Sequence, residues 1–130
     1  MKQIRGVITS GSGEACFFTG LDWVKQQCCE KLGFEPFPGT LNLKVRKEDL
    51  VVMSSLVEKR GIKLVPPVAD FCEAVCLKVS IGALEGAAIL PHVEDYYENT
   101  IEIIAPVNIK ERLNIEDGDE LIVTINGALS

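Results

Sequence analysis

Histidine occurs only once among the 130 residues of this chain, at His92. A single histidine excludes metal sites built from several imidazole ligands. The five cysteines are odd in number and form no Cys-x-x-Cys pair; they are Cys16, Cys28, Cys29, Cys72 and Cys76. This pattern argues against a disulfide framework and a zinc site, so we expect reduced and mostly buried thiols. We expect no nucleophilic role for Cys16, because nothing in the sequence ties an activating base to it.

The chain has no basic excess, no long apolar run and no signal peptide. Its formal charge is -6 and its pI is about 4.8, which argues against a nucleic-acid partner. No apolar stretch reaches the roughly 18 residues of a membrane span, and residues 1–5 do not resemble a targeting segment. With 47% hydrophobic residues, the sequence predicts one globular domain over residues 1–130. We expect a cytoplasmic monomer that contacts no membrane.

One stretch, residues 33–44, combines a turn with a polar strand entry. Pro38 fixes φ near a turn value and Gly39 can adopt a positive φ, so the pair predicts a tight turn. In the strand that follows, Thr40 and Asn42 share one face while the leucines face the other way. A hydroxyl and an amide carbonyl are neutral oxygen ligands that suit Mg²⁺ carrying substrate phosphates. The alternative is that both residues only close the turn and decorate a solvated strand face.

The rest of the chain reads as short strands separated by turns. Alternation and turn residues predict strands at 2–10, 40–45, 62–65, 71–81, 84–90, 100–105 and 120–125. Apolar spacings of three and four predict a helix over 21–32, and residues 48–60 fit either a short helix or an irregular crossover. Many short strands with few inserted helices favour a mainly β, closed barrel over a doubly wound sheet.

Two segments carry possible anion sites. Gly11 and Gly13, two residues apart, can turn backbone N–H groups toward a phosphate, although a plain loop between strands explains them equally well. Asn108 and Glu111 form a capping box for a short helix that ends at Leu113. The N-terminal N–H groups of this helix, with Lys110, predict a local anion site; the alternative is a capped surface helix.

Two further segments carry polar or aromatic residues near the expected barrel. Tyr96 and Tyr97 lie in a polar loop over 91–99, where they either stack on a planar ligand or pack half-buried. Glu102 interrupts an apolar strand on the face opposite Ile101 and Ile103. If that face lines a barrel mouth, Glu102 is a polar group beside a cavity; if the face is outside, the carboxylate is only solvated.

Taken together, these pieces resemble one family. GSGEACFF, LGFEPFPGTLNLKV, GAAILP and IEIIAPVNIKERLNIEDGDELIV, in this order and spacing, are similar to the archaeal-type CTP-dependent riboflavin kinases. The resemblance covers nearly the whole chain, and its most specific parts are GFEPFPGTLN and IEIIAPVNIKE. It implies a Greek-key, cradle-loop barrel of about six strands that transfers the γ-phosphoryl of CTP to riboflavin, giving FMN and CDP.

The resemblance also implies roles for individual residues. Thr40 and Asn42 would bind Mg²⁺, and Glu94 and Glu102 would face the flavin, with Glu102 also the candidate catalytic group. The nucleotide would contact two segments, formed by Ser12, Gly13, Glu14, Ala15, Cys16 and Phe17 and by Val107, Asn108, Ile109 and Lys110. The chain departs from the family pattern at Ala15, Glu94 and Tyr96.

Two other function classes remain open at the level of sequence. The same barrel could serve as a non-catalytic flavin or nucleotide sensor, which turnover of riboflavin with CTP would exclude. The stretch from Leu113 to Asp119 also resembles the strand entry of DNA-binding regulators of the transition-state type. The acidic charge of the chain argues against that reading, and salt-dependent DNA binding would be its signature.

Overall fold

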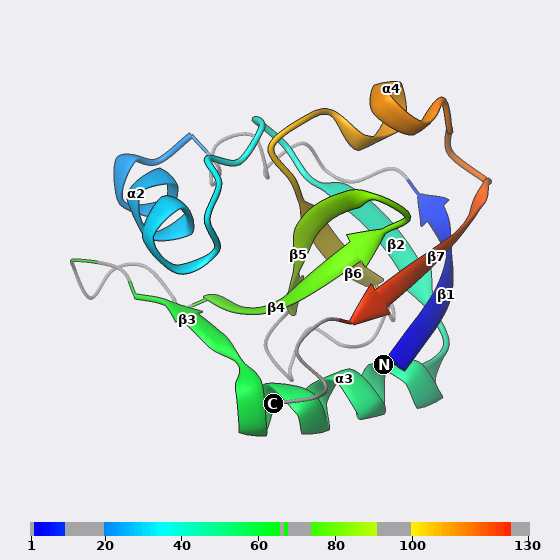
Figure 1. The fold of residues 1–130 in the computed structure, drawn as a ribbon. Helices are drawn as coiled ribbons and strands as arrows, with labels where there is room; N and C mark the ends of the chain where they lie inside the picture. Colours follow the sequence, from blue (N-terminus) through cyan, green and yellow to red (C-terminus); the bar gives the residue numbers. More distant parts are fainter. Residues whose placement is uncertain (1, 10–19, 66, 68–73, 91–99, 126–130) are drawn as a thin grey trace.

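The computed structural model describes residues 2–9, 20–65, 67, 74–90 and 100–125. Within this part of the chain, seven strands pair antiparallel in the order β3-β4-β5-β6-β2-β1-β7. The strands are β1 (Lys2–Thr9), β2 (Leu41–Val45), β3 (Ile62–Leu64), β4 (Ala74–Ile81), β5 (Leu84–Leu90), β6 (Thr100–Ile104) and β7 (Glu120–Ile125). A further pairing of β4 with β7 closes six of them into a barrel and leaves β3 attached to β4 (Figure 1). The predicted mainly β, closed barrel is therefore confirmed.

The barrel interior is filled by alternate residues of all six closed strands. In β2, for example, Leu41, Leu43 and Val45 are buried, whereas Asn42 is half-buried and Lys44 is exposed. The same two-residue period in β6 buries Ile101 and Ile103. These side chains belong to one apolar cluster that also receives side chains from β1, β4, β5 and β7. Burial of this cluster is the main favourable term that stabilises the closed sheet.

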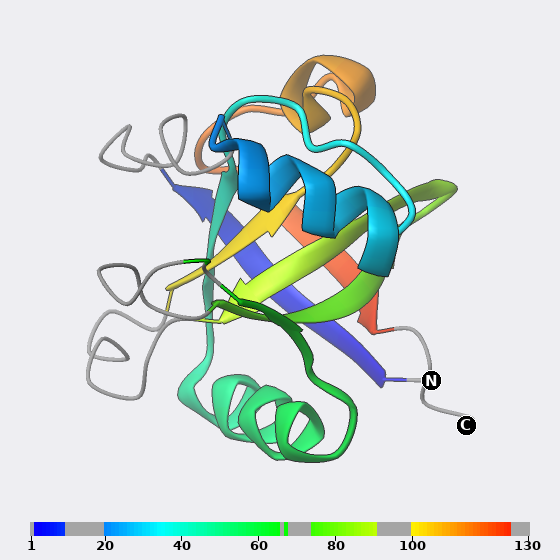
Figure 2. The same cartoon turned by 90° about the vertical axis from the view of Figure 1, so that its left-hand side faces the viewer.

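Three helices lie around the barrel within the described residues. They are α2 (Asp22–Lys31), α3 (Lys47–Arg60) and α4 (Ile109–Leu113). Leu50 and Met53 of α3 enter the barrel core, as does Ile109 of α4. Figure 2 shows α3 below one end of the barrel and α4 above the opposite end, with α2 crossing the outside between them. The ends of the barrel are thus closed by apolar side chains rather than left open.

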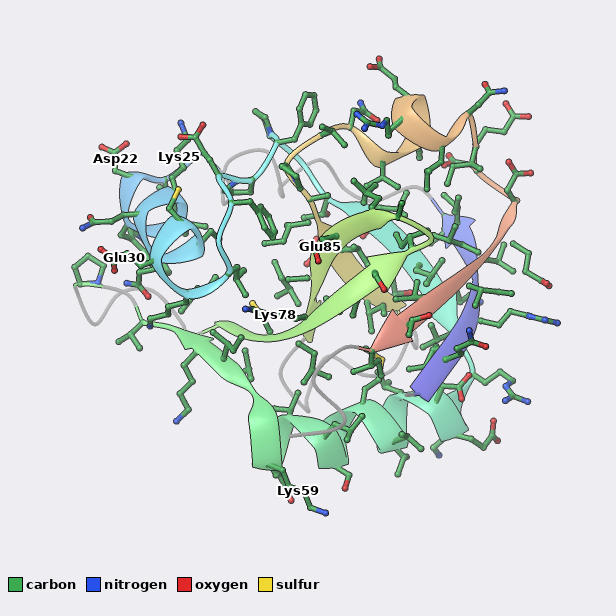
Figure 3. All side chains as sticks on the ribbon, in the orientation of Figure 1. Asp22, Lys25, Glu30, Lys59, Lys78 and Glu85 are labelled. Carbon is green, nitrogen blue, oxygen red and sulfur yellow. The ribbon has the colours of Figure 1, made fainter. Side chains whose placement is uncertain are left out.

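Helix α2 covers the outer face of β4, β5 and β6. Its buried residues Val24 and Cys28 form a second apolar cluster with outward-facing side chains of these strands, including Ile89 and Ile104. On the opposite side of α2, Asp22 and Glu30 project away from the strands (Figure 3). The helix therefore shows the one-sided burial that its apolar spacing predicts. No helix in the described part of the chain is long and apolar enough to cross a membrane.

The main difference from the sequence expectation lies after β2. The segment expected as a short helix or crossover is a regular helix of 14 residues, α3, which starts at Lys47. It forms because Leu50, Met53 and Val57 recur at spacings of three and four and pack against the barrel core. The strand expected from Thr40 begins one residue later, at Leu41. Within the long expected strand over 71–81, β4 starts at Ala74, and residues 71–73 lie outside the described part.

The cysteines of the described residues are free thiols, but they are not all buried. Cys28 and Cys76 are buried and Cys29 is exposed on α2, which agrees with the expectation of mostly buried thiols for the described residues. Burial raises the pKa of Cys28 to about 11 and that of Cys76 to about 12. Thiols with such values stay protonated and unreactive near neutral pH. Cys16 and Cys72 lie outside the described residues.

Strands β5 and β6 approach closely at Gly86. A Cβ at this position would lie 2.5 Å from the carbonyl oxygen of Ile104, which is backbone and can move only with its strand. We therefore expect Gly86→Ala to lower the free energy of unfolding by about 1 to 3 kcal/mol, as overpacking does. Glu85→Ala, at the exposed neighbouring position labelled in Figure 3, should change it by less than about 0.5 kcal/mol. Denaturant unfolding of both variants measures this, and equal stabilities would contradict the close approach.

Candidate functional site

Three polar side chains gather where β2 begins and β6 ends. Asn42 and Glu102 are direct cross-strand partners in the β2–β6 register, so they lie on the same face of the sheet. The Thr40 hydroxyl donates a hydrogen bond of 3.0 Å to Oε1 of Glu102. Residues far apart in sequence thus form one cluster, which we call the polar trio: Thr40, Asn42 and Glu102. The sequence predicted the first two as a pair and treated Glu102 separately.

The polar trio lies on the outside of the barrel. Its strand neighbours Leu41 and Ile103 point into the interior, and the alternation of each strand directs the trio the other way. One of the two sequence interpretations placed Glu102 at a barrel mouth, and the outward direction of its side chain does not agree with that interpretation. Glu102 is also not fully solvated, because it is half-buried and pairs on its other side with Ile89, a residue of the cluster under α2. A carboxylate at such a border is held in place and keeps access to a ligand.

A pocket of about 210 Å³ opens beside the trio, between the segment before β2 and the segment after β6. A backbone hydrogen bond of 2.8 Å from the N–H of Phe37 to the carbonyl of Ala105 fastens these two segments together. Figure 1 shows them side by side near α4. The pocket is lined by Phe37, Pro38, Gly39, Thr40, Leu41, Ile103, Ala105, Val107, Asn108, Ile109 and Lys110. Thr40 is therefore the residue shared by the pocket and the polar trio.

The turn before β2 takes the predicted form. Gly39 has a φ of 106°, which residues with a Cβ rarely adopt, and it follows the conformationally fixed Pro38. This geometry turns the chain at the pocket wall and directs it into β2. The turn thus places the Thr40 hydroxyl at the pocket while Leu41 continues inward to the core.

The expected nucleotide segment from Val107 to Lys110 lines the same pocket as Thr40. Asn108 is the N-cap of α4, and its side chain accepts a hydrogen bond of 3.2 Å from the N–H of Glu111, as the capping box predicts. Lys110 forms an ion pair with Asp117. Its charge is therefore already neutralised in part, which weakens the anion site that the sequence suggested there.

The donor atoms of the trio suit only certain metals. Among the described residues, no group of three or more histidine, cysteine, aspartate or glutamate side chains could hold a metal ion. The neutral oxygens of Thr40 and Asn42 fit Mg²⁺, which binds oxygen ligands and keeps waters or phosphates in its shell. Because the Thr40 hydroxyl donates a hydrogen bond to Glu102, the lone pairs of its oxygen stay available to a cation.

Part of the predicted site lies outside the described residues. This holds for the glycine-rich segment Ser12, Gly13, Glu14, Ala15, Cys16 and Phe17 and for the flavin-facing Glu94. The same is true of Tyr96 and Tyr97. The roles assigned to these residues stay predictions.

Sequence reasoning missed two features of the site. It gave no role to Phe37, which lines the pocket with its side chain 41% exposed. It also did not connect Glu102 with Thr40, although they are hydrogen-bonded. The role of Phe37 could have been suspected from the sequence, because this aromatic residue stands between two prolines and close to the candidate metal ligands. The second depends on strand register, for which a local pattern gives no signal.

Comparison with known proteins places this arrangement in a family. The family model CTP-dep_RFKase, described as a domain of unknown function (DUF120), matches residues 8–125. A riboflavin kinase of Archaeoglobus fulgidus is 36% identical over 126 residues, which cover 95% of this chain and 54% of that protein. A riboflavin kinase of Methanocella arvoryzae is 36% identical over 122 residues, covering 94% of this chain and 56% of the relative.

A third relative, a riboflavin kinase of Pyrobaculum aerophilum, is 36% identical over 127 residues, with 95% of this chain and 60% of the relative covered. The chain thus spans little more than half the length of these relatives. The match of the family model to residues 8–125 confirms the resemblance seen in the sequence motifs. By this match over most of its length, the chain belongs to the CTP-dep_RFKase family.

Proposed function

We propose that this chain is a riboflavin kinase that transfers the γ-phosphoryl group of CTP to riboflavin, giving FMN and CDP, with Mg²⁺. The observation that carries the proposal is the hydrogen bond from Thr40 to Glu102 at the edge of the pocket. This hydrogen bond joins Thr40, a candidate metal ligand, to Glu102, a carboxylate that would bind the phosphoryl acceptor. Both side chains are then within reach of one ligand site. This is the arrangement that phosphoryl transfer needs, since the donor phosphate and the accepting hydroxyl must meet.

The relatives support the acceptor, and the family name supports the donor. The proteins matched over most of this chain are named riboflavin kinases, and the family model is named for CTP dependence. The polar trio and pocket lie within the matched residues 8–125. We therefore propose that both substrates bind to the part of the molecule that the structure describes.

The CTP molecule is assigned to the pocket between the turn before β2 and the start of α4. Val107 to Lys110 form one wall and Phe37 to Leu41 the other. The nucleotide phosphates would lie toward Thr40, where the pocket meets the polar trio. The predicted second nucleotide segment, Ser12 to Phe17, follows β1, and the preceding Thr9 pairs with Asn42 in the β1–β2 register. The described part of β1 therefore ends beside Asn42, a candidate metal ligand.

Thr40 and Asn42 would hold Mg²⁺ through their side-chain oxygens. When bound, the ion neutralises phosphate charge and aligns the transferring group. The Glu102 carboxylate accepts a hydrogen bond from the Thr40 hydroxyl, which would leave the lone pairs of that oxygen directed toward the phosphates. Protein ligands without charge suit this arrangement because the phosphates bring the negative charge themselves.

Glu102 would bind the acceptor with its second oxygen. A carboxylate accepts several hydrogen bonds, and only Oε1 is used by Thr40. Oε2 is then available to a ribityl hydroxyl of riboflavin, which it would orient toward the γ-phosphorus. The hydroxyl oxygen forms the new P–O bond, the bond between the γ-phosphorus and the bridging oxygen breaks, and CDP leaves. The hydroxyl proton passes to Glu102 or to solvent, since orientation contributes more than base strength in such transfers.

The first test is the reaction itself. Purified protein with riboflavin, CTP and Mg²⁺ should form FMN, measured by chromatography, and ATP should support a much lower rate. A chelator should stop the reaction, because charge neutralisation at the phosphates is then lost. Equal rates with CTP and ATP would contradict the donor assignment. Absence of FMN with every nucleoside triphosphate would overturn the proposed function and favour a binding-only role.

The second test removes one candidate metal ligand at nearly constant shape. Thr40→Val should lower the rate of FMN formation by about 100-fold or more, or roughly 2.7 kcal/mol of transition-state stabilisation. Thr40→Ser, which keeps the hydroxyl, should retain most of the activity. The matched control Leu43→Val alters a core residue of the same strand that does not line the pocket, and it should cost about 1 kcal/mol of stability with near-normal turnover.

Rates across a Mg²⁺ titration and unfolding curves without ligand measure these changes. Thr40→Val loses the hydrogen bond to the half-buried Glu102, so a stability loss of about 0.5 to 1.5 kcal/mol is expected. That loss cannot account for a hundredfold lower rate in a protein that remains folded. Full activity of Thr40→Val at limiting Mg²⁺ would place the metal elsewhere.

The third test concerns the charge of Glu102. Glu102→Gln keeps the shape and an oxygen that accepts from Thr40, so the fold and the Thr40 orientation should persist. Hydrogen bonds to the acceptor lose their charge assistance, and the riboflavin KM should rise or kcat should fall by about 10-fold or more. Steady-state kinetics against both substrates separate the two effects. A riboflavin KM and a kcat equal to those of the wild type would leave Glu102 with a structural role only.

A further inference from the structure

Phe37 is an aromatic side chain that the fold leaves open at the wall of the pocket. It is 41% exposed, whereas most large apolar residues of the described part are buried. It lines the pocket together with Val107 and Ile109. An exposed aromatic ring that lines a pocket can offer its flat face to a ligand.

The backbone around Phe37 is rigid. Pro36 and Pro38 restrict φ on both sides of it, and its N–H is bonded to the carbonyl of Ala105 at 2.8 Å. A ring on such a backbone has only its two side-chain torsions left to order. Stacking on it therefore costs little conformational entropy, which is the condition for an effective preformed contact.

The size and lining of the pocket favour a single flat ring. At about 210 Å³ it is smaller than the roughly 300 to 1,000 Å³ of pockets that enclose drug-sized ligands such as a three-ring flavin. Its lining is apolar at Phe37, Ala105 and Val107 and polar at Thr40, Asn108 and Lys110. A pyrimidine base has a flat apolar face and a polar edge, which matches this combination.

We propose that Phe37 is the stacking residue for the nucleobase of the phosphoryl donor, and that it positions the donor without contacting the reacting atoms. This inference rests on the proposed function for the identity of the ligand. The base would lie on the Phe37 ring, between the turn before β2 and the segment 105–109, with its phosphates directed toward Thr40. The flavin would then approach from the side of Glu102, outside the pocket, so that the two substrates meet at the polar trio.

The experiment compares a ligand that has a base with one that lacks it. Binding of CDP and of inorganic tripolyphosphate, each with Mg²⁺, is measured by calorimetry for the wild type and for Phe37→Ala. Stacking is worth enough that the CDP Kd should rise between about 5-fold and about 150-fold. The tripolyphosphate Kd should stay within about twofold, because the phosphate contacts are unchanged. The riboflavin Kd, followed by flavin fluorescence, should also be unchanged.

Two further variants separate stacking from packing. Phe37→Trp keeps a flat ring and should bind CDP about as well as the wild type, whereas Phe37→Leu fills space without a ring and should lose most of the stacking. Val51→Ala is the control, since Val51 is 63% exposed on α3 at the other end of the barrel and should change no binding constant. Melting curves identify any variant that is unfolded. If Phe37→Ala is unfolded, the comparison of Phe37→Leu with Phe37→Trp tests the stacking role instead.

An unchanged CDP Kd in Phe37→Ala, or an equal loss for CDP and tripolyphosphate, would overturn the inference. If Phe37→Ala weakens riboflavin binding instead of CDP binding, the ring contacts the flavin and the inference is also overturned. The inference is likewise overturned if the wild type binds no CDP. FMN formation by the wild type distinguishes the two proposals. Turnover with an unchanged Kd in Phe37→Ala rejects only the stacking role, and selective loss of CDP binding without any turnover rejects only the kinase function.

Discussion

The pairing of Asn42 with Glu102 across β2 and β6 is the constraint on which the candidate site depends. A one-residue shift of β2 would place the Asn42 amide in the barrel core and turn leucines out, and a shift of β6 would do the same with the Glu102 carboxylate and isoleucines. The cost of burying those unpaired polar groups, several kcal/mol each, makes the register firm. The packing of Leu41, Leu43, Ile101 and Ile103 inside the barrel thus fixes the site on the outside.

The sequence predicted the fold well because its elements depend on local signals. Two-residue alternation marked the strands, and the spacing of Val24, Cys28 and Leu32 marked the buried face of α2. The Pro38-Gly39 turn also took its expected conformation. The sequence did not decide whether the segment after β2 is a helix, because its apolar residues are buried only against the end of the barrel that they cover. Local propensity is a weak guide where tertiary packing decides.

The candidate site was harder to predict because its residues come from separate strands. Thr40 and Asn42 were found as a pair since they are two positions apart on one strand. Their link to Glu102 requires knowing that β6, some sixty residues later, pairs with β2. Lys110 illustrates the same limit, because its ion pair with Asp117 is a contact that the local sequence pattern did not indicate. Charges are therefore best assigned to ligands only after their protein partners are known.

The placement of the polar trio outside the barrel has a mechanistic consequence. A site inside a six-stranded barrel would have to displace core side chains, and here the interior is filled by the main apolar cluster, with residues of α3 and α4 at its ends. An outer site instead uses the barrel as a rigid support, while segments at the strand ends form the walls that meet the ligands. Thr40 lies at the junction of the two parts, next to a core residue on one side and at the pocket on the other. A rigid strand that ends at a pocket holds its donor atoms in place before a ligand arrives, so less ordering is needed when the ligand binds.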